Sequence, residues 1–307
     1  VDRAIQAQVD AGFPGAVLAV VRDGRLVKLT AYGYAQRYDA RGALAAPPPM
    51  RTDTIFDLAS NTKMYATVFA LQRLVSEGRL EVDAPLARYL PEFAAADDDP
   101  AMRARKARVR VADLLRHAAG FATDVPFHDP SAGERYSHER ERTQALLTRL
   151  PLDYPTGSRN LYSDTDFLLA GLLVERLTGQ RLDAYVENAF YRPLGLQRTR
   201  FAPLAGGDLT PADFAATEPQ GNTRGGRVAF PGIRRHTLRG EVHDEKAYYA
   251  MGQVAGHAGL FSDAEELAVL VQLMLDGGQR DGRRFFDAAT AARFTAPAGP
   301  DPSYGLG

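Results

Sequence analysis

The residues with the clearest chemical potential are Ser60 and Lys63, in the segment Ser60-Asn61-Thr62-Lys63. Residues three apart on a helix share one face, so the hydroxyl of Ser60 and the ammonium of Lys63 would come within hydrogen-bonding reach. A serine hydroxyl needs a neighbour to take its proton before it acts as a nucleophile, and a partly buried lysine can do so. The alternative is that Ser60 caps a helix and Lys63 is an ordinary surface lysine.

Lysine is scarce in this chain. Of 37 basic residues only four are lysines, namely Lys28, Lys63, Lys106 and Lys246. Arginine is therefore the usual surface cation, and it keeps its proton, whereas a desolvated ammonium can release one. A lysine directly before the apolar run 64–71 thus favours the nucleophile-and-base interpretation over the cap.

A second group of candidates lies about a hundred residues further on, in Tyr162-Ser163-Asp164. A tyrosine hydroxyl near a lysine can pass a proton to a leaving group, and a carboxylate two residues on could orient that lysine or a substrate amide. The alternative is a helix start, with Ser163 or Asp164 as the cap and Tyr162 as a core residue.

Familiar cofactor and metal patterns are missing from the sequence. It contains no phosphate-binding P-loop, no dinucleotide-binding glycine pattern after a strand and no G-x-S-x-G elbow. Cysteine is absent, which excludes thiolate ligands and disulfides. The run His243-Asp244-Glu245 could suggest a metal site, but three successive residues rarely point at one ion. We expect neither a metal nor a cofactor.

Composition limits the partners. The 37 basic and 38 acidic residues give a net charge of −1, which offers no field to attract nucleic acid or an anionic membrane. The longest apolar run, 16–21, is far shorter than the roughly 20 residues of a membrane-spanning helix. We therefore expect no nucleic-acid partner and no transmembrane segment in this chain.

Hydrophobic periodicity predicts the elements that must position the candidate residues. A helix over 2–11 precedes a hairpin of two strands, 16–21 and 26–34. Further helices are predicted at 62–76, 111–117, 143–150, 165–177, 182–190 and 263–275. Between them we expect long irregular connections at 92–107, 118–140 and 203–250, of the kind that wraps a functional site.

A series of motifs spans essentially the whole chain: Phe56-Asp57-Leu58-Ala59-Ser60-Asn61-Thr62-Lys63, Asp113-Leu114-Leu115-Arg116-His117-Ala118-Ala119-Gly120-Phe121, Tyr162-Ser163-Asp164, Tyr191-Arg192-Pro193-Leu194-Gly195-Leu196 and Gly256-His257-Ala258-Gly259-Leu260-Phe261-Ser262. In this order they resemble the serine β-lactamase and penicillin-binding protein superfamily. The resemblance is strongest to its class C-like branch, which includes family VIII esterases. The runs 61–67 and 242–247 bring the chain nearest to the low-molecular-mass penicillin-binding proteins named as D-alanyl-D-alanine carboxypeptidases.

This resemblance implies an α+β fold of the β-lactamase/transpeptidase type, an antiparallel sheet flanked by helices. Residues 1–56 and 251–307 would form the sheet region, and 57–250 a mainly helical region with long loops. It further implies Ser60 as the acylated nucleophile, Lys63 as its base, and Tyr162 as the group that shares protons with Lys63 and the leaving group. Asp164 stands where asparagine is often found, which bears on how a substrate amide is held.

The family's third motif, a Lys or His followed by a small residue and Gly, is matched in letters by His257-Ala258-Gly259. The helix predicted from 263 argues that His257 instead forms a loop, with substrate contact as the alternative. The segment 304–307 resembles the lead-in to the motif. We therefore expect the motif and the later strands to be missing from the chain.

The function implied by the resemblance is that of a serine hydrolase working through an acyl-enzyme. A D-alanyl-D-alanine carboxypeptidase or a β-lactamase comes first; a family VIII-like carboxylesterase or a non-catalytic ligand-binding relative is the alternative. The substrate would be a small molecule or a peptidoglycan peptide, and the location the periplasm or cell envelope.

Overall fold

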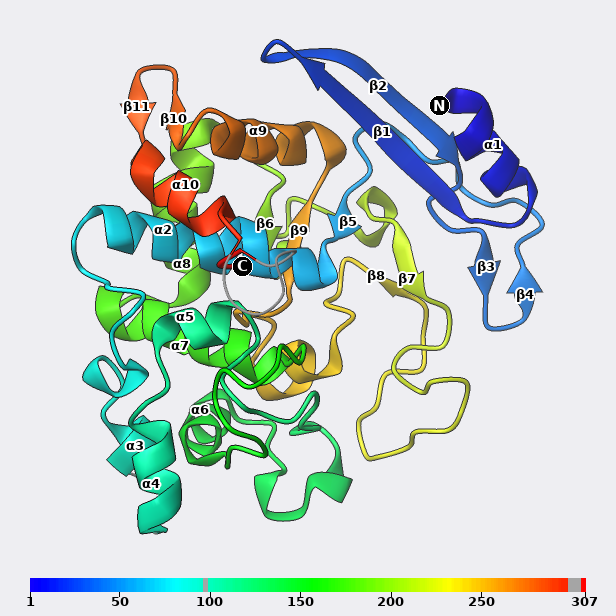
Figure 1. Cartoon of the computed structure of the whole chain (residues 1–307). Helices are drawn as coiled ribbons and strands as arrows, with labels where there is room; N and C mark the ends of the chain where they lie inside the picture. Colours follow the sequence, from blue (N-terminus) through cyan, green and yellow to red (C-terminus); the bar gives the residue numbers. More distant parts are fainter. Residues whose placement is uncertain (96–98, 298–304) are drawn as a thin grey trace.

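The N-terminal hairpin, together with the two helices that pack on it, forms one side of the molecule (Figure 1). The computed structural model describes residues 1–95, 99–297 and 305–307. Strands β1 (Gly15–Arg22) and β2 (Arg25–Gly33) pair antiparallel. Helix α1 (Asp2–Asp10) packs on β2, and α9 (Ala264–Leu275) packs on both strands. The predicted hairpin and both helices are confirmed.

The other large predicted helices are also present, with changed ends. The segment predicted as one helix over 62–76 is a continuous run of three forms: a 3-10 turn, η1 (Ala59–Asn61), a π-helix, η2 (Lys63–Val68), and α2 (Phe69–Ser76). The remainder are α5 (Val111–Leu115), α6 (Arg140–Arg149), α7 (Asp164–Thr178) and α8 (Leu182–Val186) continued by the π-helix η5 (Glu187–Tyr191).

The prediction of an irregular connection over 92–107 is wrong. Helices α3 (Glu92–Ala95) and α4 (Pro100–Lys106) occupy most of it, and 96–98 lie outside the described residues. The side chain of Asp99 accepts the N–H of Ala101 at 2.9 Å, and proline takes the first helical position. Both are helix-start signals that the abundance of aspartate and proline obscured.

Very short strands, not predicted from the sequence, connect distant segments. Strand β9 (Leu260–Ser262) pairs antiparallel with β5 (Phe56–Asp57) on one side and β6 (Arg200–Phe201) on the other. The remaining pairs are β3 (Tyr38–Asp39) with β4 (Gly42–Ala43), β7 (Ala216–Glu218) with β8 (Leu238–Arg239), and β10 (Gln279–Arg280) with β11 (Arg283–Arg284). Helix α10 (Ala288–Thr295) follows and packs on α2.

The main hydrophobic core surrounds η2, α2 and α7. Phe69, Phe167 and Phe190 are almost fully buried in it, together with Phe261 of β9. The backbone of α7 also lies against the segment before β9, where a Cβ added to Gly256 would meet the carbonyl oxygen of Phe167 at 2.1 Å. The element carrying Lys63, the helix after Tyr162 and the segment carrying His257 are thus packed together. No helix in the described part of the chain is both long and apolar enough to cross a bilayer.

Candidate active site

Ser60 is presented at the start of the helical run by a strained turn. Strand β5 ends at Asp57, and Ala59 then adopts a positive φ of 46°, a conformation that a non-glycine residue rarely takes. Asp57 Oδ1 accepts the N–H of Ala59 at 2.7 Å and supports the turn. Burial raises the pKa of Asp57, while the N–H groups of His243 and Ala59 oppose the rise. Ser60 itself is exposed, as a nucleophile must be.

Lys63 lies beneath Ser60, one helical turn on, and is 4% exposed. Its Nζ is 3.0 Å from Ser60 Oγ, 2.7 Å from the hydroxyl of Tyr162 and 2.9 Å from Asp164 Oδ1. It also lies 3.2 Å from the carbonyl oxygen of His257. Besides its bond to carbon, an amine nitrogen can take part in three hydrogen bonds. Four partners compete for them, so a proton can move among Lys63, Ser60 and Tyr162 without large rearrangement.

Tyr162 closes a triangle with Ser60 and Lys63. Its hydroxyl donates to Ser60 Oγ at 2.8 Å, and the residue is 45% exposed, so it faces the space where a substrate would lie. The ring is held from behind by His117, at 4.5 Å between centroids. Neighbouring Ser163 directly precedes α7, but its hydroxyl donates to the carbonyl of Ala122 at 2.6 Å and caps no helical N–H. The interpretation of Tyr162 as a core residue is therefore wrong.

Asp164 lies between two lysines. Its Oδ1 binds Lys63, and its Oδ2 is 3.1 Å from the Nζ of Lys246, which also contacts Asp124 at 2.7 Å. Burial favours the neutral acid, but His257, Lys63 and Lys246 together outweigh it and lower the pKa of Asp164. Each oxygen of the Asp164 carboxylate thus contacts the Nζ of one lysine.

His257 reaches the site through its backbone. Its carbonyl binds Lys63, whereas its fully buried imidazole contacts Asp244, with 2.9 Å between Nε2 and Oδ1. Burial opposes ionisation of Asp244, but His257, Lys246 and the N–H of Ala247 lower its pKa well below the ordinary value. The loop-forming interpretation of His257 agrees with this geometry.

Asp164, Asp244 and His257 also form a cluster whose potential ligand atoms lie within 4.8 Å of one another. A divalent cation placed there would have to displace Lys63 or Lys246 from Asp164, since each holds one carboxylate oxygen. The donor set therefore fits a lysine network better than a metal centre. His243 and Glu245, the other members of the run weighed from the sequence, lie outside this cluster.

Sequence reasoning missed several residues that complete the site. Below Tyr162, His117 Nδ1 lies 2.9 Å from Asp166 Oδ2 and 3.3 Å from the N–H of Ser163. Burial, with Lys63 nearby, lowers the pKa of His117 to about 4, and burial raises that of Asp166 well above its usual value. The scarcity of lysine could have identified Lys246, and the motif 113–121 contains His117, whereas no comparable signal marks Asp166.

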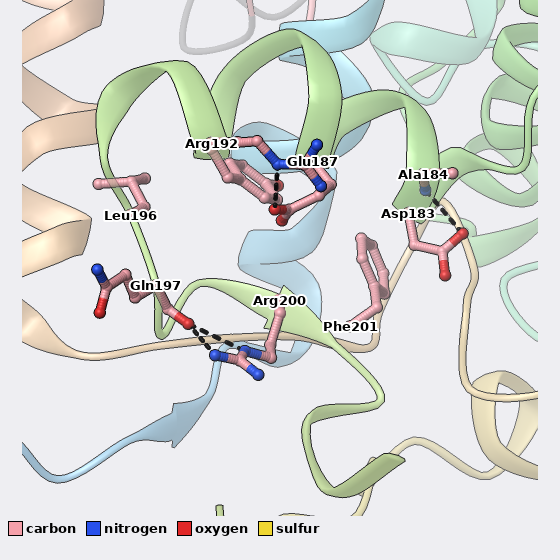
Figure 2. A pocket seen from close by; sticks show the side chains of 9 residues that line it. Asp183, Ala184, Glu187, Arg192, Leu196, Gln197, Arg200 and Phe201 are labelled. Carbon is pink, nitrogen blue, oxygen red and sulfur yellow. Dashed lines mark hydrogen bonds and ion pairs between the residues drawn. The ribbon is translucent and has the colours of Figure 1, made fainter. Parts of the chain in front are cut away.

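A cavity of about 580 Å³ lies elsewhere, beside the end of α8 and strand β6. Figure 2 shows its lining, where Arg192 meets Glu187 and Arg200 binds the carbonyl oxygen of Gln197. None of its lining residues belongs to the cluster around Ser60. The candidate nucleophile is therefore not part of this cavity.

Known proteins resemble this chain over its whole length. The Beta-lactamase family model matches residues 1–307. The "N-acetylmuramyl-L-alanine amidase" of Bacillus subtilis is 50% identical over 308 residues, covering 100% of this chain and 69% of the relative. A "Putative D-alanyl-D-alanine carboxypeptidase" of Salmonella agona is 46% identical, covering 99% of this chain and 70% of the relative.

Among solved structures, a penicillin-binding protein homologue from Caulobacter crescentus is 26% identical, with a TM-score of 0.67. The match covers 96% of this chain and 74% of that one. The family match over the full chain and the structural likeness agree with the α+β fold and with the resemblance that the motifs carry. The chain belongs to the Beta-lactamase family, whose fold and general serine-hydrolase character it shares.

Proposed function

We propose that the protein hydrolyses an amide bond of a peptidoglycan-derived peptide through an acyl-enzyme formed on Ser60. The observation that carries the proposal is the mutual contact of Ser60, Lys63 and Tyr162. The polar atoms lie 3.0 Å apart between Lys63 and Ser60, 2.7 Å between Lys63 and Tyr162, and 2.8 Å between Tyr162 and Ser60. An exposed hydroxyl beside a buried amine and a phenol is what nucleophilic acyl transfer requires.

In the proposed reaction Ser60 Oγ attacks the substrate carbonyl carbon, and its proton passes to the amine of Lys63. The tetrahedral intermediate then collapses as Tyr162 donates a proton to the leaving nitrogen, and Lys63 restores the proton of Tyr162. Water then attacks the carbonyl carbon of the ester, and its proton passes to the free amine of Lys63. As the ester bond breaks, that proton moves from Lys63 to Ser60 Oγ, and the acid is released. Asp164 holds Lys63 in place, at 2.9 Å.

The substrate class is supported by the names of the relatives. One is named for cleavage next to N-acetylmuramic acid and the other for cleavage of D-alanyl-D-alanine. Both reactions break an amide in a cell-wall peptide, and both are compatible with a serine nucleophile. We accordingly propose the periplasm or cell envelope as the location, since such peptides occur there.

Two measurements test the proposal. Intact-protein mass spectrometry after incubation with a labelled penicillin or a p-nitrophenyl ester should show an adduct that Ser60→Ala abolishes. An adduct that persists in this variant would refute the role of Ser60. The ratio kcat/KM, compared for N-acetylmuramyl-L-alanine, a D-alanyl-D-alanine peptide, a cephalosporin and the ester, then identifies the substrate class. A preference for the ester alone would favour a carboxylesterase and overturn the proposed peptide substrate.

A further inference from the structure

Lys246 is a second buried lysine beside the candidate site, and the reaction as proposed above does not use it. It begins the π-helix η9 (Lys246–Ala250) and is 7% exposed. Its Nζ contacts Asp164 Oδ2 at 3.1 Å, while Lys63 contacts Oδ1 of the same carboxylate at 2.9 Å. One carboxylate is therefore the shared counter-ion of both lysines.

The surroundings of Lys246 keep it charged. Burial alone would lower its pKa, but the carboxylates of Asp244, Asp164 and Asp124 outweigh burial and raise it above the ordinary value. Asp124 is the most exposed of the three, so solvent screens its contribution most. The ring of His128 lies near Lys246, and burial lowers the pKa of this imidazole. Lys246 is thus a fixed positive charge at neutral pH.

Lys63 is surrounded differently. Besides Asp164 it contacts the phenol of Tyr162 and the carbonyl of His257, and the buried side chains of His117 and Asp166 lie nearby. Asp164 is the only carboxylate among the described residues that forms an ion pair with it. The free energy of the Lys63 ammonium therefore depends on how far Asp164 is already neutralised by Lys246.

We propose that Lys246 is a positioning residue. It binds one oxygen of Asp164 and so prevents this carboxylate from holding Lys63 permanently in its protonated form. The inference rests on the proposed function, in which Lys63 must accept the proton of Ser60. Two electrostatic effects act in the same direction. Lys246 weakens the attraction between Asp164 and the Lys63 ammonium, and its own charge repels that ammonium.

The test is the pH profile of Ser60 labelling, measured between pH 5 and 10 by intact mass with a fluorophosphonate probe, which phosphonylates the hydroxyl and releases fluoride. Without the charge of Lys246, in Lys246→Met or Lys246→Gln, we expect the acidic limb to move up by about one pH unit. Labelling at pH 7 should then slow roughly tenfold, because a carboxylate that is no longer neutralised, here Asp164, shifts the ionisation of a neighbouring cation by one unit or more. The limiting rate at the alkaline end of the profile should be unchanged.

Two further variants separate charge from shape. Lys246→Arg keeps the charge and should leave the acidic limb in place. The double variant Asp164→Asn/Lys246→Met removes both charges, so its acidic limb should return to the wild-type position even where the lost contact to Lys63 lowers the rate at every pH. Lys28→Met, which changes an exposed lysine paired with Asp2, is the matched control and should not move the limb.

An unmoved limb in Lys246→Met and Lys246→Gln, or a double variant whose limb stays where it lies in Lys246→Met, overturns the inference while the proposed function stands. Failure of the probe to label Ser60 in the wild-type protein at any pH overturns the proposed function, and the inference with it.

Discussion

The backbone N–H of His243 donates a hydrogen bond of 2.8 Å to Oδ2 of Asp57, across 186 residues of sequence. The other oxygen of Asp57 supports the strained turn before Ser60. The carboxylate therefore ties the segment that carries Asp244 and Lys246 to the strand that leads to the candidate nucleophile. Its position makes Asp57 a support for the turn that presents Ser60.

Replacing Asp57 by asparagine should weaken both stability and acylation. The amide has one acceptor oxygen, so one of the two N–H donors would face its NH₂ group and lose its partner, at a cost of about 1–3 kcal/mol. Urea denaturation measures this loss, and the labelling rate of Ser60 should fall roughly tenfold or more as the turn relaxes. Asp53→Asn, in an exposed ion pair with Arg51, is the control. Equal stability of the two variants would contradict the prediction.

Lys63→Arg tests proton transfer directly. Arginine keeps a positive charge near Asp164 but does not act as a base at accessible pH. We expect kcat/KM on the best substrate to fall by roughly 10²–10⁴. Thermal unfolding checks that the variant is folded, and Lys28→Arg should retain full activity. Activity within a few-fold of the wild type would show that Lys63 is not the base.

Tyr162→Phe removes the hydroxyl that contacts both Ser60 and Lys63. Because the ring is half-exposed and the rest of it remains, the unfolding free energy should change little. The value of kcat should fall by roughly 10²–10⁴ if the phenol transfers the proton to the leaving group. Tyr136→Phe serves as a control. A normal kcat with a raised KM would assign Tyr162 to substrate binding instead.

His117 should make stability fall in acid. Its pKa is lowered to about 4 by burial first and by Lys63 second, against about 6.5 in the unfolded chain. A depressed pKa contributes stability that is present above pH 6.5 and lost as the pH falls towards 4, here about 3 kcal/mol. The raised pKa of Asp166 acts in the opposite sense, costing stability as the pH rises above the ordinary carboxyl value.

Asparagine is the variant that isolates this effect. His117 has a positive φ of 53°, which asparagine tolerates better than most residues, and its side chain does not titrate. Urea denaturation between pH 4 and 7 should show a shallower loss of stability in His117→Asn than in the wild type. Parallel curves for the two proteins would mean that His117 is not the titrating group.

The local part of the site could be predicted from the sequence. The spacing of Ser60 and Lys63 places them on one helical face, and the structure gives 3.0 Å between their polar atoms. Tyr162 needed the resemblance to known motifs, because nothing local indicates that it returns to Lys63 across 99 residues. The catalytic roles and the division into a sheet region and a helical region remain predictions.

Other features depended on long-range contacts that no window of sequence contains. Strands β5, β6 and β9 are two or three residues long, too short for a period-two pattern to be recognised. Lys246 shares Asp164 with Lys63 only because η9, at the end of the segment 203–250, lies beside the start of α7. The acidic run within 92–107 resembled a loop since aspartate and proline both favour turns and helix starts.

Hydrogen bonds tie the backbone of Leu260, which is fully buried in β9, to the segment that carries Ser60. The N–H of Leu58 donates to its carbonyl at 2.9 Å, and its own N–H donates to Thr62 Oγ1 at 3.0 Å. These amides should exchange hydrogen slowly, although Ser60 above them is open to solvent. Because the backbone at Leu260 is rigid while Ser60 is open to solvent, the surrounding loops can change to accept new acyl groups without altering the position of Ser60.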